Sequence, residues 1–182
     1  MANGAIFPAH VAQSTAEIKT SKSVELLHIN ARSIRSKSDD IITFIYFCNM
    51  TFNVLMFTET WYDDDTEHLV MPGYNHFFLN RKESRGGGVA LQTNFSGFQL
   101  IDDYTVATED YEILYVRKDS QMFKVIYRPP HVSIRGFLGF FDKLLSFASN
   151  NAYTLTIGGG LNVDALRDLV PAVDLLITHT AM

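Results

Sequence analysis

The sequence has a single cysteine, Cys48, so no disulfide bond can form within the chain. Proteins of oxidising compartments use disulfides far more often, and the scarcity of cysteine therefore favours an intracellular, reducing environment. Cys48 lies in the apolar stretch IITFIYFCNM, residues 41–50. A reactive thiol needs an electropositive and partly exposed setting, so we expect Cys48 to be a small buried hydrophobic residue.

Positive charge is also scarce. The chain has 15 Lys and Arg against 20 Asp and Glu, a formal net charge of −5, which argues against holding nucleic acid through bulk positive charge. Any contact with phosphate must therefore be local. The candidates for such a contact lie in three segments: Arg32, Arg35 and Lys37; Arg81, Lys82 and Arg85; and Arg128. Most such side chains, taken singly, are solvated surface residues.

The chain also lacks the signals of membrane and nucleotide-cofactor proteins. Residues 1–22 contain neither a basic n-region nor a continuous apolar core, so we expect a flexible leader rather than a secretory signal or a membrane span. The glycine runs SRGGGVAL and TIGGGLNV lack both the G-x-G-x-x-G spacing and the GK[ST] ending. A nucleotide cofactor is therefore not expected.

The first third of the chain reads as strand, helix, strand. VELLHIN, residues 24–30, and NVLMFT, residues 53–58, are short apolar runs that end at polar residues. Between them, residues 39–49 place apolar side chains at helical spacing, with Ser38 as the expected N-cap and two acidic residues in the first turn. The pattern predicts a βαβ unit.

From Tyr74 the pattern changes to short apolar runs separated by turn residues. These runs, YNHFFL, GGVALQ, FQLI, YEILYVR and MFKVIY, predict a meander of antiparallel strands that the sequence RPP ends. An apolar stripe then predicts a helix over 134–149 with Ser133 as N-cap, and a strand over 153–157 follows. The order indicates mixed sheets with helices outside, an α/β to α+β fold.

Polar residues collect where three of the expected strands end. Asn30 follows LLHI, Glu59 follows VLMFT, and Asn162 with Asp164 follows TLTIGGG. Sites in layered α/β folds form where strand ends converge, so these residues are candidates for binding phosphate or metal. Taken singly, an Asn or Asp after a strand more often makes a turn, and a loop Glu is more often solvated.

Taken together, these motifs resemble a known family. LLHINARSIRSK, VLMFTETWYDDD, RGGGVAL, Glu112 in YEILYVR, VIYRPP and TIGGGLNVD are similar, in order and spacing, to the endonuclease domain of non-LTR (LINE-type) retrotransposons. That domain resembles apurinic/apyrimidinic endonucleases, within the endonuclease/exonuclease/phosphatase superfamily. The resemblance implies a four-layer α/β sandwich of two mixed β-sheets flanked by helices, over residues 23–164, with a divergent tail over 165–182.

The resemblance also implies an activity and a partner. The expected reaction is metal-dependent nicking of duplex DNA at a target site, which primes reverse transcription, with nuclear location when the DNA is chromosomal. Glu59 would bind Mg²⁺ or Mn²⁺, Asn30 would help to hold metal-bound groups, and Tyr127 would contact the scissile phosphate. Asn162 would position the attacked group, and Arg32 and Arg128 would bind substrate. Hard oxygen ligands of this kind suit Mg²⁺.

The sequence departs from the family at two places. Family members carry GGDFN where this chain has GGGLN, so Gly160 stands at the position of the catalytic aspartate. The family also continues into a segment with a Ser-Asp-His motif, whereas this chain stops at Met182 and its His179 lacks the preceding Ser-Asp, which predicts a fold that is incomplete at its C-terminus. We therefore expect impaired or absent turnover. The alternatives are a nuclease-dead remnant or interaction module of the same fold, and a phosphatase-type member that acts on small phosphoesters.

Overall fold

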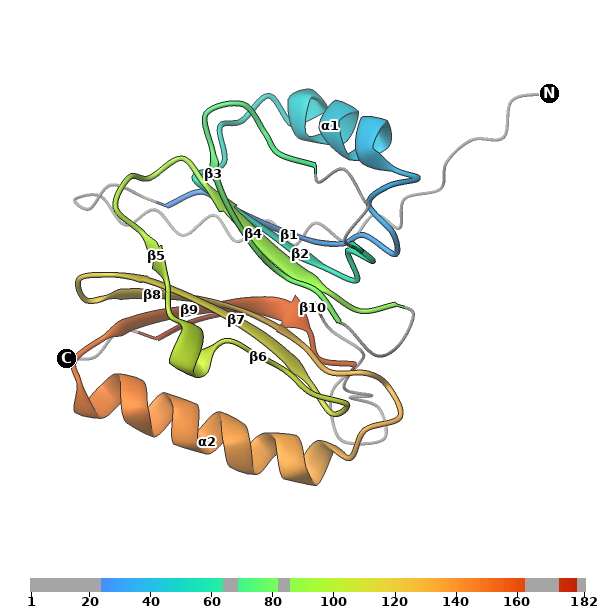
Figure 1. Cartoon of the computed structure of the whole chain (residues 1–182). Coiled ribbons are helices and arrows are strands. Elements are labelled where there is room, and N and C mark those ends of the chain that lie inside the picture. Colours follow the sequence, from blue (N-terminus) through green and yellow to red (C-terminus); the bar gives the residue numbers. More distant parts are fainter. Residues whose placement is uncertain (1–23, 64–68, 82–85, 163–173, 180–182) are drawn as a thin grey trace.

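The structure is a computed structural model that describes residues 24–63, 69–81, 86–162 and 174–179. Its elements form four layers, with two β-sheets face to face and one α-helix on each outer face (Figure 1). Helix α1 (Ser38–Phe47) covers the first sheet, and α2 (Ile134–Asn150) covers the second. The predicted four-layer sandwich of two mixed sheets is thus confirmed.

The first sheet has the strand order β1-β2-β4-β3. Its strands are β1 (Leu26–Asn30), β2 (Val54–Thr58), β3 (Asn75–Leu79) and β4 (Val89–Thr93). β1 and β2 pair in parallel because α1 carries the chain back across the sheet between them, while β4 runs antiparallel to both β2 and β3. The βαβ unit expected from the sequence is therefore present.

The second sheet has the order β10-β9-β8-β7-β5, and β6 also pairs with β7. Its strands are β5 (Gln99–Leu100), β6 (Val106–Ala107), β7 (Glu112–Lys118), β8 (Gln121–Tyr127), β9 (Thr154–Gly160) and β10 (Asp174–His179). α2 links β8 to β9, which pair in parallel, and the remaining pairs are antiparallel. A short 3₁₀ helix, η1 (Asp102–Tyr104), lies between β5 and β6.

The expected single meander is wrong. The runs between Tyr74 and Tyr127 divide between the two sheets: β3 and β4 belong to the first, and β5, β7 and β8 belong to the second. An alternating pattern shows that one face of a strand is buried, but it does not show which sheet the strand joins. In a sandwich, successive strands can pass from one sheet to the other.

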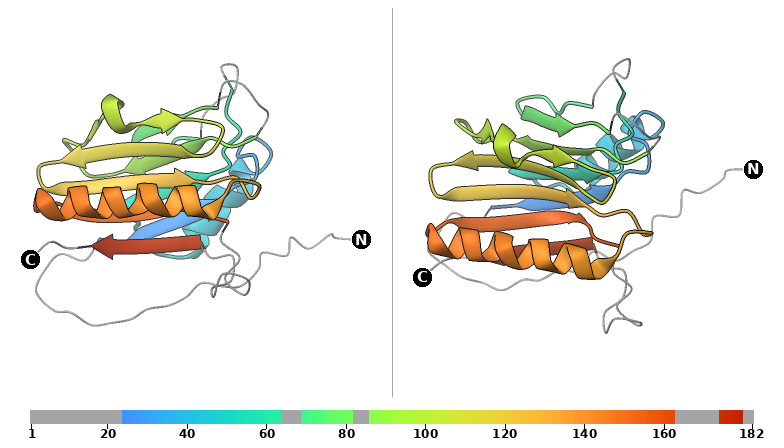
Figure 2. Two further views of the ribbon diagram at one scale, coloured as in Figure 1. Left: turned by 90° about the horizontal axis from the view of Figure 1, so that it is seen from below. Right: turned by 60° about the horizontal axis from the view of Figure 1, so that its bottom comes forward.

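Part of the segment over 165–182, for which the sequence predicted a divergent tail, is described by the structure. Its residues 174–179 form β10, which pairs antiparallel with β9 along the edge of the second sheet (Figure 2). His179 pairs with Leu155 in this ladder. The leader over 1–22, Lys82, Arg85 and Asp164 lie outside the described residues.

The structure also tests the expected N-caps of the two helices and the expected burial of Cys48. The N-cap of α1 is Lys37 rather than Ser38, and Ser133 is the N-cap of α2 as expected, although neither makes a side-chain capping bond. Cys48 is half-buried rather than fully buried, and packs against the apolar cluster beneath α1. No helix in the described part of the chain has the length and apolar character needed to cross a membrane.

Side chains of β8 alternate between two apolar layers. Phe123, Val125 and Tyr127 belong to the layer between the sheets, whereas Met122 and Ile126 pack beneath α2. The two apolar layers therefore pack on opposite faces of β8 and hold this strand in place. Polar groups gather at one end of the layer between the sheets.

A polar site between the sheets

Two rows of paired residues meet at one end of the sandwich. In the first sheet, Asn30 pairs with Thr58 at the last positions of β1 and β2. In the second, Gly160 pairs with Tyr127, which in turn pairs with Glu112. A β-carbon placed on Gly160 would lie 3.5 Å from Oγ1 of Thr58, so the two rows are in contact.

Asn30 and Glu59 form a direct hydrogen bond at this end. Nδ2 of Asn30 donates to Oε1 of Glu59 at 2.9 Å. Within the described residues, Oδ1 of Asn30 is buried and has no hydrogen-bond partner. The pair therefore presents a carboxylate whose orientation is fixed by an amide, together with an acceptor oxygen that is still available.

The backbone around Glu59 is held in an uncommon conformation. Its φ is 53°, in the left-handed region that residues with a β-carbon rarely adopt. The carbonyl of Glu59 accepts a hydrogen bond from the backbone N–H of Ser33 at 2.9 Å, which fixes the residue against the loop after β1. Strain of this kind persists where neighbouring groups hold the backbone in place.

Tyr127 completes the group around Glu59. Burial raises the pKa of its phenol to about 12, and the negative charges of Glu59 and Glu112 add to the shift, together with a hydrogen bond to Glu59. The side chain is 7% exposed. At neutral pH the hydroxyl is therefore protonated and can donate a hydrogen bond.

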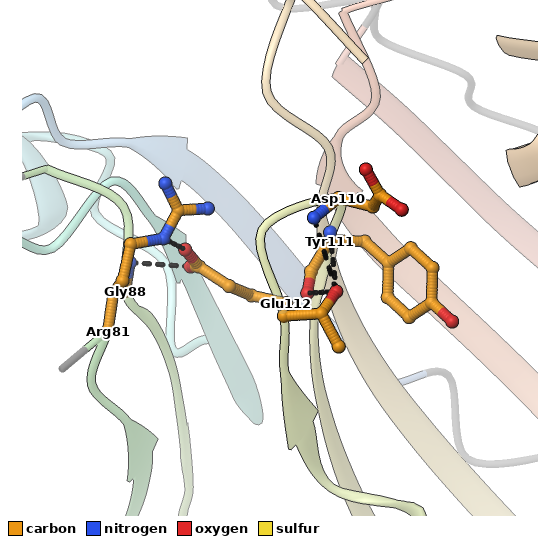
Figure 3. Close-up of polar contacts among 6 residues, drawn as sticks. Arg81, Gly88, Asp110, Tyr111 and Glu112 are labelled. Atoms are coloured by element: carbon orange, nitrogen blue, oxygen red, sulfur yellow. Dashed lines mark hydrogen bonds and ion pairs between the residues drawn. The ribbon is translucent and has the colours of Figure 1, made fainter. Parts of the chain in front are cut away.

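Glu112 belongs to one of the motifs that resemble the LINE-type domain, but the sequence alone assigned it no role. Its side chain is fully buried, with Oε1 2.7 Å from Nε of Arg81 and Oε2 accepting from the backbone N–H of Gly88 at 2.5 Å (Figure 3). Burial raises the pKa of the carboxyl and outweighs the lowering by Arg81. The signal in the sequence was an acidic residue within the otherwise apolar run YEILYV.

The first glycine run allows this buried pair to form. Gly86, Gly87 and Gly88 all have left-handed φ values, of 95°, 74° and 84°. A β-carbon on Gly87 would collide with the Glu112 carboxylate, and one on Gly88 would collide with the Thr60 hydroxyl. The run is therefore a close-packing loop ahead of β4.

In the second glycine run, the space for a side chain differs between Gly159 and Gly160. A β-carbon on Gly159 would collide with the backbone of Ile126, whereas one on Gly160 would meet only ordinary contacts, 3.5 Å from the Thr58 hydroxyl and the Tyr127 ring. The backbone of Gly160 is outside the left-handed region, so this position can hold a side chain. Asp174 of β10 is its pairing partner on the other side.

Arg128 and Asn162 are linked to each other near the end of β9. Nε of Arg128, which is 3% exposed, donates to the carbonyl of Leu161 at 2.7 Å, and its other nitrogens donate to the carbonyls of Val132 and Asn162. Nδ2 of Asn162 donates back to the carbonyl of Arg128 at 2.7 Å. These bonds fix the turn after β9 and engage the guanidinium with the protein itself.

The remaining candidate, Arg32, is exposed and has a φ of 45° in the loop after β1. The structure thus brings Asn30, Glu59, Tyr127 and the Gly160 position together, with Asn162 just after Gly160. Within the described ranges, no three His, Cys, Asp or Glu side chains form a ready-made metal cluster.

Comparisons with known proteins identify the fold. No family model matches the chain, and a search of curated proteins finds no relative. Among solved structures, the chain is similar to the endonuclease domain of TRAS1, a telomere-specific non-LTR retrotransposon, with 13% identity and a TM-score of 0.52 over 79% of this chain and 61% of that one.

Two further structures show the same likeness. An AP endonuclease from Archaeoglobus fulgidus has 17% identity and a TM-score of 0.50, over 78% of this chain and 58% of that one. The 3′ phosphatase NExo from Neisseria, bound to a product DNA hairpin, has 13% identity and a TM-score of 0.51, over 79% and 60%. The chain therefore has the α/β sandwich fold of endonucleases, exonucleases and phosphatases, and spans 58–61% of the length of these three structures.

Proposed function

We propose that this chain is a retrotransposon-derived endonuclease domain whose site binds a divalent cation and a DNA phosphodiester, with turnover impaired by Gly160. The observation that carries the proposal is the hydrogen-bonded pair of Asn30 and Glu59, with Tyr127 beside it, at the strand ends of this fold. The motifs that resemble the LINE-type domain meet at this place, and nuclear location would follow from chromosomal DNA as the target.

The residues present suit a hard divalent cation. The Glu59 carboxylate and the buried Oδ1 of Asn30, which has no partner among the described residues, are oxygen ligands of the kind that Mg²⁺ and Mn²⁺ prefer. Mg²⁺ commonly uses only one or two protein carboxylates and keeps several waters, so a larger acidic cluster is not required. When bound, the cation neutralises charge on the phosphodiester.

Other side chains of the site would act on the same phosphodiester. The phenol of Tyr127 is protonated and hydrogen-bonded to Glu59, and it would turn its single O–H to a phosphate oxygen when the Glu59 carboxylate binds the cation. Asn30 orients the Glu59 carboxylate, and Asn162, held by Arg128, would position the attacked group. Glu112 would support the site without contacting the phosphodiester, because its carboxylate holds Arg81 and the Gly88 backbone in place.

Gly160 removes the group that would activate water. General-base assistance contributes about 10²- to 10⁴-fold to the rate of a reaction, and glycine has no side chain to supply it. The same observation favours a second candidate function, that of a nuclease-dead module which retains the fold and the cation site. The two candidates differ in turnover and agree in metal binding.

A nicking assay and a binding assay together test the proposal. Supercoiled plasmid is incubated with Mg²⁺ or Mn²⁺, and cation binding is followed by Mn²⁺ titration. Slow nicking that Glu59→Gln abolishes supports the endonuclease, with Glu109→Gln, an exposed loop residue, as matched control. Metal binding without nicking supports the nuclease-dead module. Phosphate release from small esters would favour a phosphatase, and absence of metal binding would contradict the proposed site.

A further inference from the structure

Trp61 is the only tryptophan of the chain, and it lies two residues after Glu59 at the edge of the polar site. Its side chain is 38% exposed, although large aromatic residues are usually buried more completely. Its φ is 54°, close to the 53° of Glu59, so two residues with β-carbons adopt left-handed backbone within three positions. Packing in the core does not explain why a partly exposed aromatic side chain is held in this unfavourable backbone conformation, so a role in binding is considered.

The backbone bonds around Trp61 show that its position is fixed. Its N–H donates to the carbonyl of Gly87 at 2.9 Å, and the N–H of Thr60 donates to the carbonyl of Gly88 at 3.2 Å. A β-carbon placed on Gly86 would lie 3.6 Å from Nε1 of the indole. Gly88 of the same loop donates its backbone N–H to the buried Glu112 (Figure 3), and a β-carbon on Gly87 would collide with that carboxylate. The backbone of Trp61 is thus fixed to the loop that also supports the site, and its indole lies beside Gly86.

Several basic side chains among the described residues near the site are engaged within the protein itself. Arg81 is paired with Glu112, and the Arg128 guanidinium donates to backbone carbonyls. Nζ of Lys37 donates to the carbonyl of Ala31 at 3.0 Å, and the whole chain carries a net charge of −5. Among the described residues the exposed Arg32 remains for contact with phosphate, and in a chain of net negative charge an uncharged contact would add affinity at this end of the molecule.

We infer that Trp61 stacks on an unpaired nucleobase next to the phosphodiester at Glu59. The inference deepens the proposed function, on which the position of the phosphodiester rests. Every nucleobase offers an aromatic face, but only a base that has left the helical stack exposes it to a side chain. The favoured ligand is accordingly DNA with a bulged, gapped or single-stranded nucleotide, and an intact duplex binds more weakly.

Because Trp61 is the only tryptophan, its fluorescence reports stacking directly. The protein is titrated, in EDTA to prevent cleavage, with a DNA hairpin that carries one unpaired adenine and with the same hairpin fully paired. We expect saturable quenching by the bulged hairpin, with an affinity about 5- to 100-fold higher than for the paired one. Equal quenching by both hairpins, or no quenching by either, would overturn the inference.

Variants are compared by the anisotropy of labelled hairpins. Trp61→Ala should remove the preference for the bulged hairpin, and Trp61→Phe should retain part of it. Phe47→Ala is the matched control, because Phe47 is an exposed aromatic residue at the end of α1, which runs away from the site. Melting curves check folding, and should Trp61→Ala not fold, the Phe variant and the fluorescence titration decide.

The proposed function and the inference can fail separately. Quenching by the bulged hairpin without any nicking in Mg²⁺ would reject the endonuclease and keep the stacking role. Nicking that depends on Glu59 but is equal for Trp61→Ala and the parent chain, with no quenching, would keep the endonuclease and reject the stacking role.

Discussion

The amide of Asn30 donates a 2.9 Å hydrogen bond to the carboxylate of Glu59, although the two residues are 29 positions apart in the chain. The bond forms because β1 and β2 are parallel neighbours that end at the same edge of the sheet. It leaves Oδ1 of Asn30 buried and with no partner among the described residues. The pair therefore places two oxygens, one from the carboxylate and one from the amide, at the end of the sheet where the proposed cation would bind.

Replacing Asn30 by alanine should weaken cation binding. The change removes one oxygen and releases the Glu59 carboxylate, and losses of such supporting groups typically cost about 10- to 100-fold in metal affinity. Mn²⁺ titration followed by electron paramagnetic resonance measures the effect. Asn151→Ala, which alters an exposed amide beyond α2, serves as control. Unchanged affinity in Asn30→Ala would remove this residue from the cation site.

Substitutions of Glu112 and Arg81, which form a buried ion pair, should have strongly non-additive effects on the free energy of unfolding. Glu112→Ala leaves the half-buried guanidinium without its carboxylate, which typically costs about 3–5 kcal/mol in the free energy of unfolding. In Glu112→Ala/Arg81→Ala the second change should cost much less than it does alone, because the ion pair between the two residues is then already broken. Urea unfolding of the four proteins gives the coupling energy, and strictly additive costs would show that the pair is not coupled.

The helix over 134–149 and the βαβ unit could be predicted from the sequence because both depend on local patterns. An apolar stripe at helical spacing specifies α2, and the polar residues Asn30 and Glu59 mark the ends of two apolar runs. The convergence of these strand ends follows from the parallel pairing that a helical crossover imposes. The meeting of Asn30 and Glu59 at one end of the sheet was therefore predictable.

Features that depend on distant partners could not be predicted in the same way. β4 pairs with β2, more than 30 residues earlier, and this pairing decides which sheet the strand joins. Glu112 appeared only as an acid in an apolar strand, because its partner Arg81 lies in another segment. β10 was missed since its place depends on the exposed edge of β9, which the local sequence over 174–179 does not show.

Because of Lys124, the free energy of unfolding should increase with pH in the alkaline range. Its ammonium is buried over the ring of Tyr115, 4.4 Å from the centroid, and burial lowers the pKa of Lys124 from 10.5 to about 8. The unfolded chain therefore binds more protons than the folded chain between pH 8 and 10.5, so the free energy of unfolding should rise across this range. The raised pKa of Tyr127, about 12, acts in the opposite sense only above pH 10.

The Lys124 effect is measured by urea unfolding between pH 7 and 10. Lys124→Met should stabilise the protein at pH 7 by about 1–3 kcal/mol, since the cost of burying the ammonium disappears, and the gain should shrink toward pH 10. Lys143→Met on the exposed face of α2 is the control. A loss of stability in Lys124→Met at pH 7 would mean that contacts of the ammonium with the aromatic rings outweigh its desolvation.

The two neighbouring glycines at the end of β9 should respond differently to aspartate. Gly160→Asp should fold, because its β-carbon meets only ordinary contacts with Thr58 and Tyr127, whereas Gly159→Asp should unfold the protein because its β-carbon would collide with the Ile126 backbone. Circular dichroism melts test this contrast. Two variants that melt alike would contradict the described packing.

The same Gly160→Asp variant tests the proposal that Gly160 impairs turnover. A β-carbon at this position would lie 3.5 Å from the Thr58 hydroxyl and the Tyr127 ring, and the proposal assigns the new carboxylate the role of a general base. In residues 1–182 we expect nicking to stay low, because the LINE-type domains that the sequence resembles also use the histidine of a Ser-Asp-His segment. A longer chain that combines Gly160→Asp with such a segment should nick about 10²- to 10⁴-fold faster than the same longer chain with Gly160, the range of general-base catalysis. Plasmid nicking with Glu59→Gln as the inactive control measures the difference. Robust, Glu59-dependent nicking by Gly160→Asp in residues 1–182 would show that the aspartate alone was missing.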